Sequence, residues 1–105
     1  MATSRALKIK DELYEDLKDP AYAAAYLNEA LVDGDEIVLK TALADVVKAQ
    51  GVQRVARRAG IHRVTVYKTL KPDTESSFTV IRQLLAACNV SLNVQPFQPE
   101  RRRTS

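Results

Sequence analysis

The chain has 105 residues, about the size of one small domain, and carries a net charge of +3 at pH 7. Hydrophobic residues make up 46% of it, but three glycines, four prolines and 6% aromatic residues are few for a β-sandwich or a β-barrel. Because it has no apolar run of ~20 residues, no signal peptide and one cysteine, we expect a soluble, mainly α-helical protein of a reducing cytoplasm, without a membrane span or internal disulfide.

The first predicted element is a short helix behind a flexible arm. Residues 1–10 show no apolar periodicity and are predicted to form this arm. Leu13, Tyr14 and Leu17 then fall at helical spacing, which predicts about two turns of helix. So short a helix needs a partner surface to be stable.

Two amphipathic helices are predicted next. Asp19 followed by proline is a strong helix start, because aspartate caps free amides and proline is tolerated at the first helical position. This helix should run from Pro20 to Asp33, where Gly34 can adopt the left-handed conformation that ends helices. Asp35 is expected to cap the second helix, which ends before Gly51.

Three further helices are expected in the second half of the chain. The segments Val52–Ala59 and His62–Lys71 have helical patterns and flank the dipeptide Gly60–Ile61. Proline and turn-forming residues then interrupt the pattern. Either Ser77 or Thr79 can cap the last helix.

A short C-terminal β-strand is predicted after the last helix. Val90, Leu92 and Val94 alternate with polar residues, which is typical of a half-buried strand. A lone strand has to pair, and a second copy of the chain is one candidate. Residues 96–105 are expected to form a disordered basic tail, so that a single mainly α-helical domain covers residues 11–95.

The charges are divided unevenly along the chain. Residues 1–45 hold five Lys/Arg and ten Asp/Glu, residues 46–72 hold seven Lys/Arg and no acid, and residues 73–105 hold four Lys/Arg and three Asp/Glu. An acid-free basic segment within a helical domain is typical of a surface that contacts phosphates. The middle of the chain is therefore predicted to bind nucleic acid.

This basic segment also has the pattern of a helix-turn-helix, over residues 52–70. Ala56 is small where two helices would cross closely, and Gly60 lies at the turn, where a positive φ is needed. Four apolar residues would hold both helices to a core: Val55, Ile61, Val66 and Leu70. The sequence therefore predicts a DNA-binding motif.

Four side chains of the second motif helix should face outward: Arg63, Val64, Tyr67 and Lys68. Arg63 can donate two hydrogen bonds to guanine, Val64 can pack on a thymine methyl, and Lys68 can reach a base or a phosphate. His62 is expected to cap the helix or to meet a phosphate. The candidates for phosphate contacts are Gln53, Arg54, Arg57 and Lys71, although Arg57 and Arg58 could instead only solvate a helix face.

The chain resembles the addiction-module antidote proteins from about residue 11 to residue 94. The most specific segments are Ala-Tyr-Leu-Asn at residues 25–28 and Val-Tyr-Lys at residues 66–68. The helix-turn-helix alone would indicate only the wider lambda-repressor-like class, a five-helix fold. The segments that carry the resemblance are Leu17–Pro20, Ala25–Leu31, Gly34–Asp35, Ala42–Val46, Gly51–Gln53, Ala59–Gly60, Val66–Lys68 and Val90–Val94.

The resemblance implies a bacterial cytoplasmic antitoxin, encoded beside a small RelE/ParE-type toxin, that represses its own operon. By analogy, base recognition falls on residues 62–68, which adds His62 and Thr65 to the outward-facing candidates. Such toxins are typically basic, so the acidic first 45 residues are expected to bind the toxin. The candidate toxin contacts are Leu13, Tyr14, Leu17, Tyr22 and Tyr26. A homodimer on a palindromic operator is also expected.

Two other functions remain open at this point. The chain could be a stand-alone phage or chromosomal regulator without a toxin, or an adaptor whose helix-turn-helix binds no DNA. An enzyme is not expected, because the sequence lacks paired carboxylates on one face, metal-ligand spacing, a nucleophile with a nearby base and a glycine-rich phosphate loop. No metal, cofactor or membrane partner is expected either.

Overall fold

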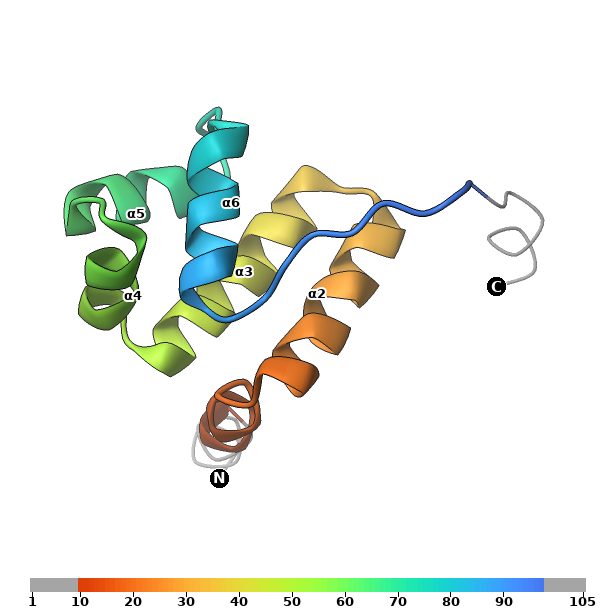
Figure 1. Ribbon diagram of the computed structural model, residues 1–105, viewed down its shortest axis with the longest axis horizontal. Coiled ribbons are helices and arrows are strands. Elements are labelled where there is room, and N and C mark those ends of the chain that lie inside the picture. Colours follow the sequence, from red (N-terminus) through yellow and green to blue (C-terminus); the bar gives the residue numbers. More distant parts are fainter. Residues whose placement is uncertain (1–9, 98–105) are drawn as a thin grey trace, which may run out of the picture.

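A computed structural model describes residues 10–97 of the chain (Figure 1). Residues 10–16 are helical and are followed by α2 (Pro20–Asp33), α3 (Glu36–Gln50), α4 (Val52–Ala59), α5 (Arg63–Leu70) and α6 (Phe78–Ala87). The mainly α-helical prediction is therefore confirmed. Apart from Lys10, which is helical, and residues 96 and 97, the predicted arm and basic tail lie outside the described residues.

Local hydrogen bonds set the ends of α2 and α3. The Asp19 carboxylate accepts a hydrogen bond from the Ala21 N–H at 3.2 Å, and that of Asp35 accepts one from the Ile37 N–H at 2.8 Å. Gly34 ends α2 with a φ of 78°, a conformation that costs glycine little because it has no Cβ. Both helices thus have the predicted bounds.

The helices pack around one core (Figure 1). α2 and α3 run side by side in opposite directions. α4, α5 and α6 are grouped around the part of α3 that leads into α4. The largest fully buried side chains come from almost every element: Leu17, Leu43, Val46, Val47, Val55, Val66, Leu84 and Cys88. No helix within residues 10–97 combines the length and apolar character needed to cross a membrane.

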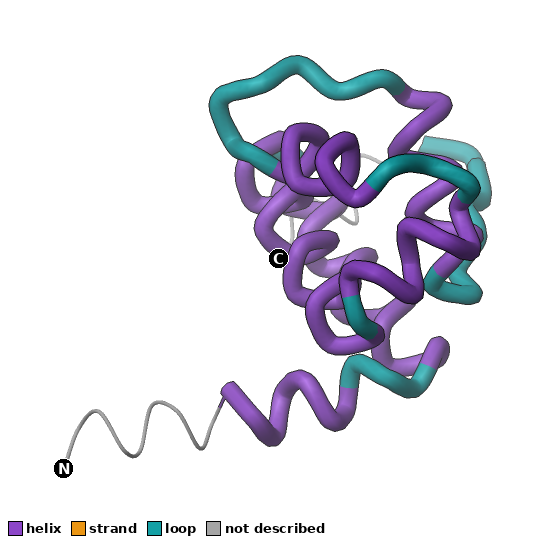
Figure 2. Tube along the Cα trace, turned by 90° about the vertical axis from the view of Figure 1, so that its left-hand side faces the viewer, coloured by secondary structure: helices purple, strands orange, loops and turns teal. Residues whose placement is uncertain are grey.

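The predicted β-strand at Val90–Val94 is wrong. Residues 90–97 form an extended segment that passes in front of α3 and α2 in Figure 1, and Figure 2 shows only helices and loops in the described part of the chain. Between described residues, no backbone hydrogen bond involves residues 91–96. A strand needs a neighbouring strand to pair its amides and carbonyls, and residues 10–97 offer none.

Two titratable side chains of the core have raised pKa values. Burial raises the pKa of the Cys88 thiol to about 11, although the positive charge of Arg58 opposes part of this shift. Burial also raises the pKa of the Tyr26 hydroxyl to about 12, and the hydrogen bond that this hydroxyl donates to Asp45 at 2.7 Å adds to the effect. Both groups are therefore uncharged at neutral pH.

The free energy of unfolding should accordingly fall at alkaline pH. The folded state favours the neutral Cys88 thiol, so its contribution to stability is complete below the ordinary thiol pKa of about 9 and is lost as the pH rises through about 11. Urea unfolding between pH 8 and pH 11 measures this loss. Cys88→Ala should show a smaller loss over that range, and an equally steep loss in the variant would contradict the assignment.

Candidate nucleic-acid interface

The turn between α4 and α5 fixes the angle of the two helices. Gly60 has a φ of 72° and donates its N–H to the Arg57 carbonyl at 3.2 Å, while the Ile61 N–H bonds to the Ala56 carbonyl at 3.1 Å. These two bonds close the end of α4. Ala56 and Val66 are buried on the inner sides of the two helices, so α4 and α5 are held to the core as one unit.

The outer face of α5 is open to solvent. His62 is the N-cap, and its Nδ1 accepts a hydrogen bond from the Val64 N–H at 3.2 Å. Arg63 and Lys68 are exposed, and Val64 and Tyr67 are 55% and 50% exposed, so the face offers both charged and apolar groups to a partner. The structure thus places these four candidates on one accessible face, whereas Thr65 beside them is half-buried.

The candidates for phosphate contacts lie on both sides of this face. Gln53, Arg54 and Arg57 are exposed on α4, and Lys71 is exposed just after α5. No side chain in the described part of the chain caps the first amides of α4, which begins directly after Gly51. Free N–H groups at a helix N-terminus favour anions, so this end of α4 suits a phosphate as well.

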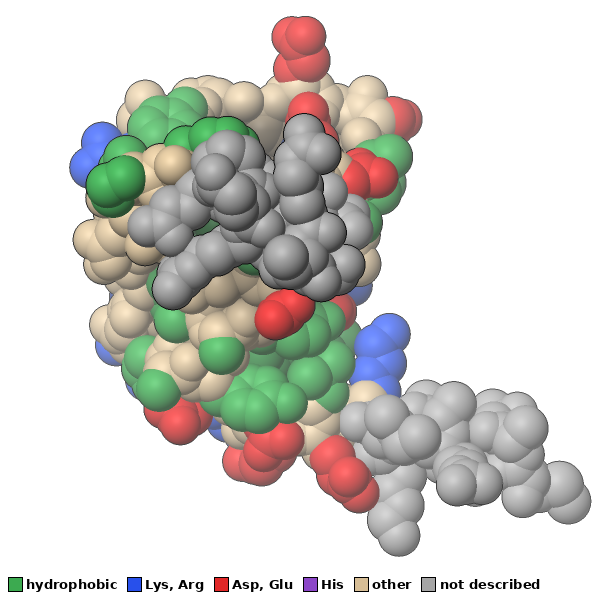
Figure 3. Space-filling view, turned by 90° about the vertical axis from the view of Figure 1, so that its right-hand side faces the viewer, with side chains coloured by type: hydrophobic (Ala, Val, Ile, Leu, Met, Phe, Trp, Pro, Cys, Tyr) green, Lys and Arg blue, Asp and Glu red, His purple; other side chains and the backbone are tan. Residues whose placement is uncertain are grey.

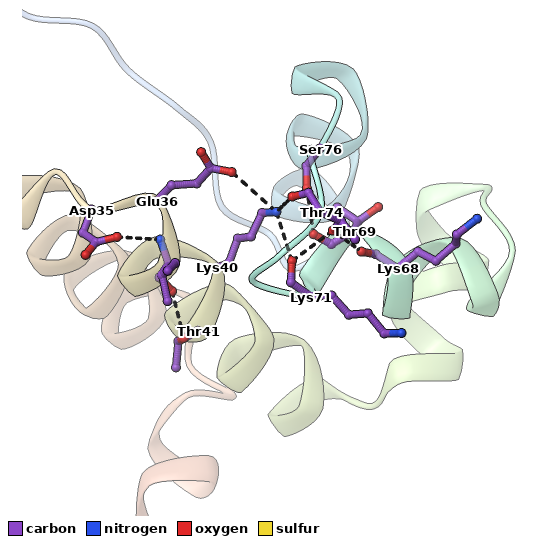
Figure 4. A network of polar contacts seen from close by, with 10 residues as sticks. Asp35, Glu36, Lys40, Thr41, Lys68, Thr69, Lys71, Thr74 and Ser76 are labelled. Atoms are coloured by element: carbon purple, nitrogen blue, oxygen red, sulfur yellow. Dashed lines mark hydrogen bonds and ion pairs between the residues drawn. The ribbon is translucent and has the colours of Figure 1, made fainter.

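A buried lysine holds the end of α5 in place (Figure 4). Lys40 of α3 is 3% exposed, and its ammonium donates hydrogen bonds to the carbonyls of Lys71, at 3.1 Å, and Thr74. The Glu36 carboxylate lies 3.5 Å away from the same nitrogen. Because α3 belongs to the core, Lys40 ties the chain after the outward-facing helix to a fixed support.

Two hydroxyl groups complete this network (Figure 4). Thr74 Oγ1 donates to the carbonyls of Lys68 at 2.7 Å and Lys71 at 3.0 Å, and Ser76 Oγ donates to that of Thr69 at 2.8 Å. These carbonyls lie at or just after the C-terminus of α5, where the regular helical hydrogen bonds end. None of these supporting residues was predicted from the sequence. The one signal there was that Lys40 shares the inward face of α3.

Arg58 and Gln50 bind the end of α6 rather than facing freely outward. The Arg58 guanidinium donates to the Ala87 carbonyl at 3.2 Å, and the Gln50 amide donates to the Cys88 carbonyl at 3.3 Å. Arg58 therefore connects α4 to α6. Arg57 is exposed as well, but it makes no such contact with the described residues. Within those residues, no group of three or more His, Cys, Asp or Glu is placed to hold a metal ion.

Comparison with known proteins adds a family to this geometry. A family model described as "Probable addiction module antidote protein" matches residues 8–96. The chain belongs to this family. A Haemophilus influenzae protein that carries only the name "Uncharacterized protein" is 30% identical over 89 residues, which cover 84% of this chain and 92% of that protein. No solved structure matches. The predicted family resemblance is thus confirmed, and membership in an antidote family implies a toxin as partner.

The end of this antidote family member that faces away from α4 and α5 is acidic and apolar. Figure 3 shows mainly hydrophobic, acidic and uncharged side chains on the described part of this face, with few basic ones. Apolar side chains near the junction of α2 and α3 are well exposed, including Val32 at 60% and Ile37 at 52%. An apolar surface surrounded by acids suits a basic protein partner.

The five candidate toxin contacts are not equally accessible. Tyr22 is 44% exposed on α2, whereas Leu13 and Tyr14 are half-buried against the core. Tyr26 is also half-buried and binds Asp45. Leu17 has no exposed surface at all, so it acts as the anchor of residues 10–16 rather than as an accessible contact.

Proposed function

We propose that this protein is the DNA-binding antitoxin of a toxin–antitoxin pair. In this proposal it neutralises a small basic toxin of the RelE/ParE type by direct binding and represses its own operon. The observation that carries the DNA-binding half is the exposed face of α5, which presents Arg63, Val64, Tyr67 and Lys68 within an acid-free part of the sequence. Family membership supports the antitoxin half and disfavours a stand-alone regulator.

Recognition would follow the lambda-repressor-like arrangement, with α5 in the major groove of operator DNA. Arg63 would donate two hydrogen bonds to a guanine edge, and the exposed Val64 would pack on a thymine methyl. His62, Thr65, Tyr67 and Lys68 complete the set near the base edges. Gln53, Arg54, Arg57 and Lys71 would bind phosphates, which fixes the position of the protein without reading sequence.

The protein acts in this proposal through binding alone, as a homodimer in the bacterial cytoplasm. One α5 of eight residues reads only a few base pairs, so two copies would share a palindromic operator. The acidic first 45 residues, with Tyr22 exposed on α2, would bind the toxin, and α4 and α5 would bind DNA.

A footprinting experiment on the DNA upstream of the gene tests this proposal. The wild-type protein should protect a palindromic site, and more salt should weaken binding because phosphate contacts release counterions. Arg63→Ala should weaken specific binding by about 10-fold to 100-fold, which corresponds to the loss of one good base contact. Lys68→Ala should also weaken specific binding to the operator.

Arg82→Ala is the matched control, because Arg82 is an exposed arginine on α6, outside the proposed interface. It should leave the footprint and its salt dependence nearly unchanged. Equal losses for Arg63→Ala and Arg82→Ala would contradict base reading by α5. Failure to protect any site, with or without the protein encoded beside this one, would contradict operator binding altogether.

A further inference from the structure

A groove on the surface between α2, α3 and α6 is not explained by DNA or toxin binding. It has a volume of about 720 Å³, and the start of the extended segment of residues 90–97 forms one of its walls. Its apolar lining comes from all three helices and includes Leu27, Leu31, Leu39, Leu43, Ile81 and Leu85. Exposed apolar surfaces that are rimmed by polar residues are common at sites where proteins bind a partner.

The groove is effectively uncharged. Glu36 and Lys40 are the charged side chains among its described lining residues, and they pair with each other at 3.5 Å. The polar lining otherwise consists of amides and hydroxyls, such as those of Asn28, Asn93 and Ser91. This neutrality contrasts with the acidic and basic halves of the sequence, so neither a basic toxin nor DNA is the expected occupant.

Apolar side chains of the same molecule are left exposed beside this groove. Phe78 at the start of α6 is 68% exposed, and Leu92 in the extended segment is 42% exposed. Val94, two residues further, is 99% exposed. Its neighbours in the chain, Asn93 and Gln95, both line the groove. Of the alternating apolar residues that suggested a strand, Val90 packs partly against the core, whereas Leu92 and Val94 remain exposed within residues 10–97.

We propose that the groove and the extended segment of residues 90–97 form a self-association surface. In this arrangement Leu92 and Val94 of one copy pack into the groove of a second copy, and the second copy does the same in return. A two-fold interface brings identical surfaces together, so charges of one sign would repel across it. A neutral groove with apolar side chains and amides at its edge has the composition of such an interface.

This dimer would fix the position of one DNA-binding unit relative to the other. Ser76 lines the groove, and its hydroxyl binds the Thr69 carbonyl at the end of α5. The contact between copies therefore lies next to the support of the outward-facing helix. The inference deepens the proposed function by locating its homodimer, but self-association can be measured without DNA or toxin.

Sedimentation of the full chain over a range of micromolar concentrations tests the surface. The wild-type protein should be dimeric, and Val94→Asp and Phe78→Glu should each raise the dimer dissociation constant by about tenfold or more. Val64→Asp is the matched control, because Val64 is also an exposed apolar residue but lies on α5, away from the groove. Circular dichroism should show that all three variants keep the wild-type helix content, since the replaced side chains are exposed.

Three outcomes would overturn the inference. A wild-type protein that remains monomeric has no such dimer, and a dimer that is unchanged in Val94→Asp and Phe78→Glu uses another surface. If these variants instead lose binding to a toxin, the groove belongs to that partner. An intact dimer that fails to bind its operator would refute the proposed DNA binding alone, so the two proposals fail separately.

Discussion

Replacing Lys40 with alanine is expected to lower the free energy of unfolding by about 3 kcal/mol, because a buried ammonium that donates to two carbonyls is lost. Removal of a buried charge can stabilise a protein when its partners are removed as well. Here the partners are main-chain carbonyls, and that of Thr74 has no other hydrogen bond among the described residues. The ion pair with Glu36 adds little, since that carboxylate is 69% exposed.

Urea unfolding of Lys40→Ala and Lys40→Met separates the lost hydrogen bonds from the lost volume. The methionine variant keeps most of the side-chain volume but none of the hydrogen bonds. Its free energy of unfolding should therefore fall by nearly as much as that of Lys40→Ala. Lys48→Ala is the control on the same helix, because Lys48 is exposed, and it should change the free energy by less than about 0.5 kcal/mol. Similar stabilities for Lys40→Ala and Lys48→Ala would show that the network does not support α5.

Leu17→Ala should destabilise the protein by about 3 kcal/mol, the usual cost of removing a large buried side chain and leaving a cavity. Leu17 is fully buried and follows the helical residues 10–16, so its loss should also free that segment. Urea unfolding measures the first effect, and proteolysis near Lys18 measures the second.

Lys18→Ala provides the comparison for Leu17→Ala. Lys18 pairs with Glu15 at 3.3 Å, but both side chains are mostly exposed, so the change should be less than about 0.5 kcal/mol. Equally small effects would mean that residues 10–16 do not depend on the core. The burial of Leu17 also means that deleting residues 1–18 would damage the core, so Tyr22→Ala maps a toxin contact more cleanly.

The helix bounds could be predicted because short-range contacts determine them. Asp19, Asp35 and Ser77 each cap a helix through an amide two or three residues away, and such contacts are visible in the sequence as a residue type beside an apolar pattern. Between Ser77 and Thr79, the structure selects Ser77 as the cap. The outward face of α5 follows in the same way from the inward position of Val66.

Contacts between distant residues could not be predicted. The carbonyls that Lys40 binds are 31 and 34 residues away, and the one that Arg58 binds is 29 residues away. The strand prediction is wrong for the same reason, because the alternation at Val90–Val94 indicates a need for burial without naming the surface that meets it. A half-exposed extended segment beside a groove has the same residue pattern as a half-buried strand.

The junction at Gly51 makes the length of α3 a geometric constant of the molecule. This glycine, with a φ of 96°, both ends α3 and begins α4, so one residue separates the fifteen-residue helix from the helix-turn-helix. α3 is about 22 Å long, and insertion of one residue would lengthen it by about 1.5 Å and rotate everything beyond by about 100°. A partner on the acidic end and an operator on the basic end would then meet the protein at a new relative angle. The number of residues in α3 therefore sets the helical phase between its two ends, in the way that base-pair spacing sets the phase between two sites on DNA.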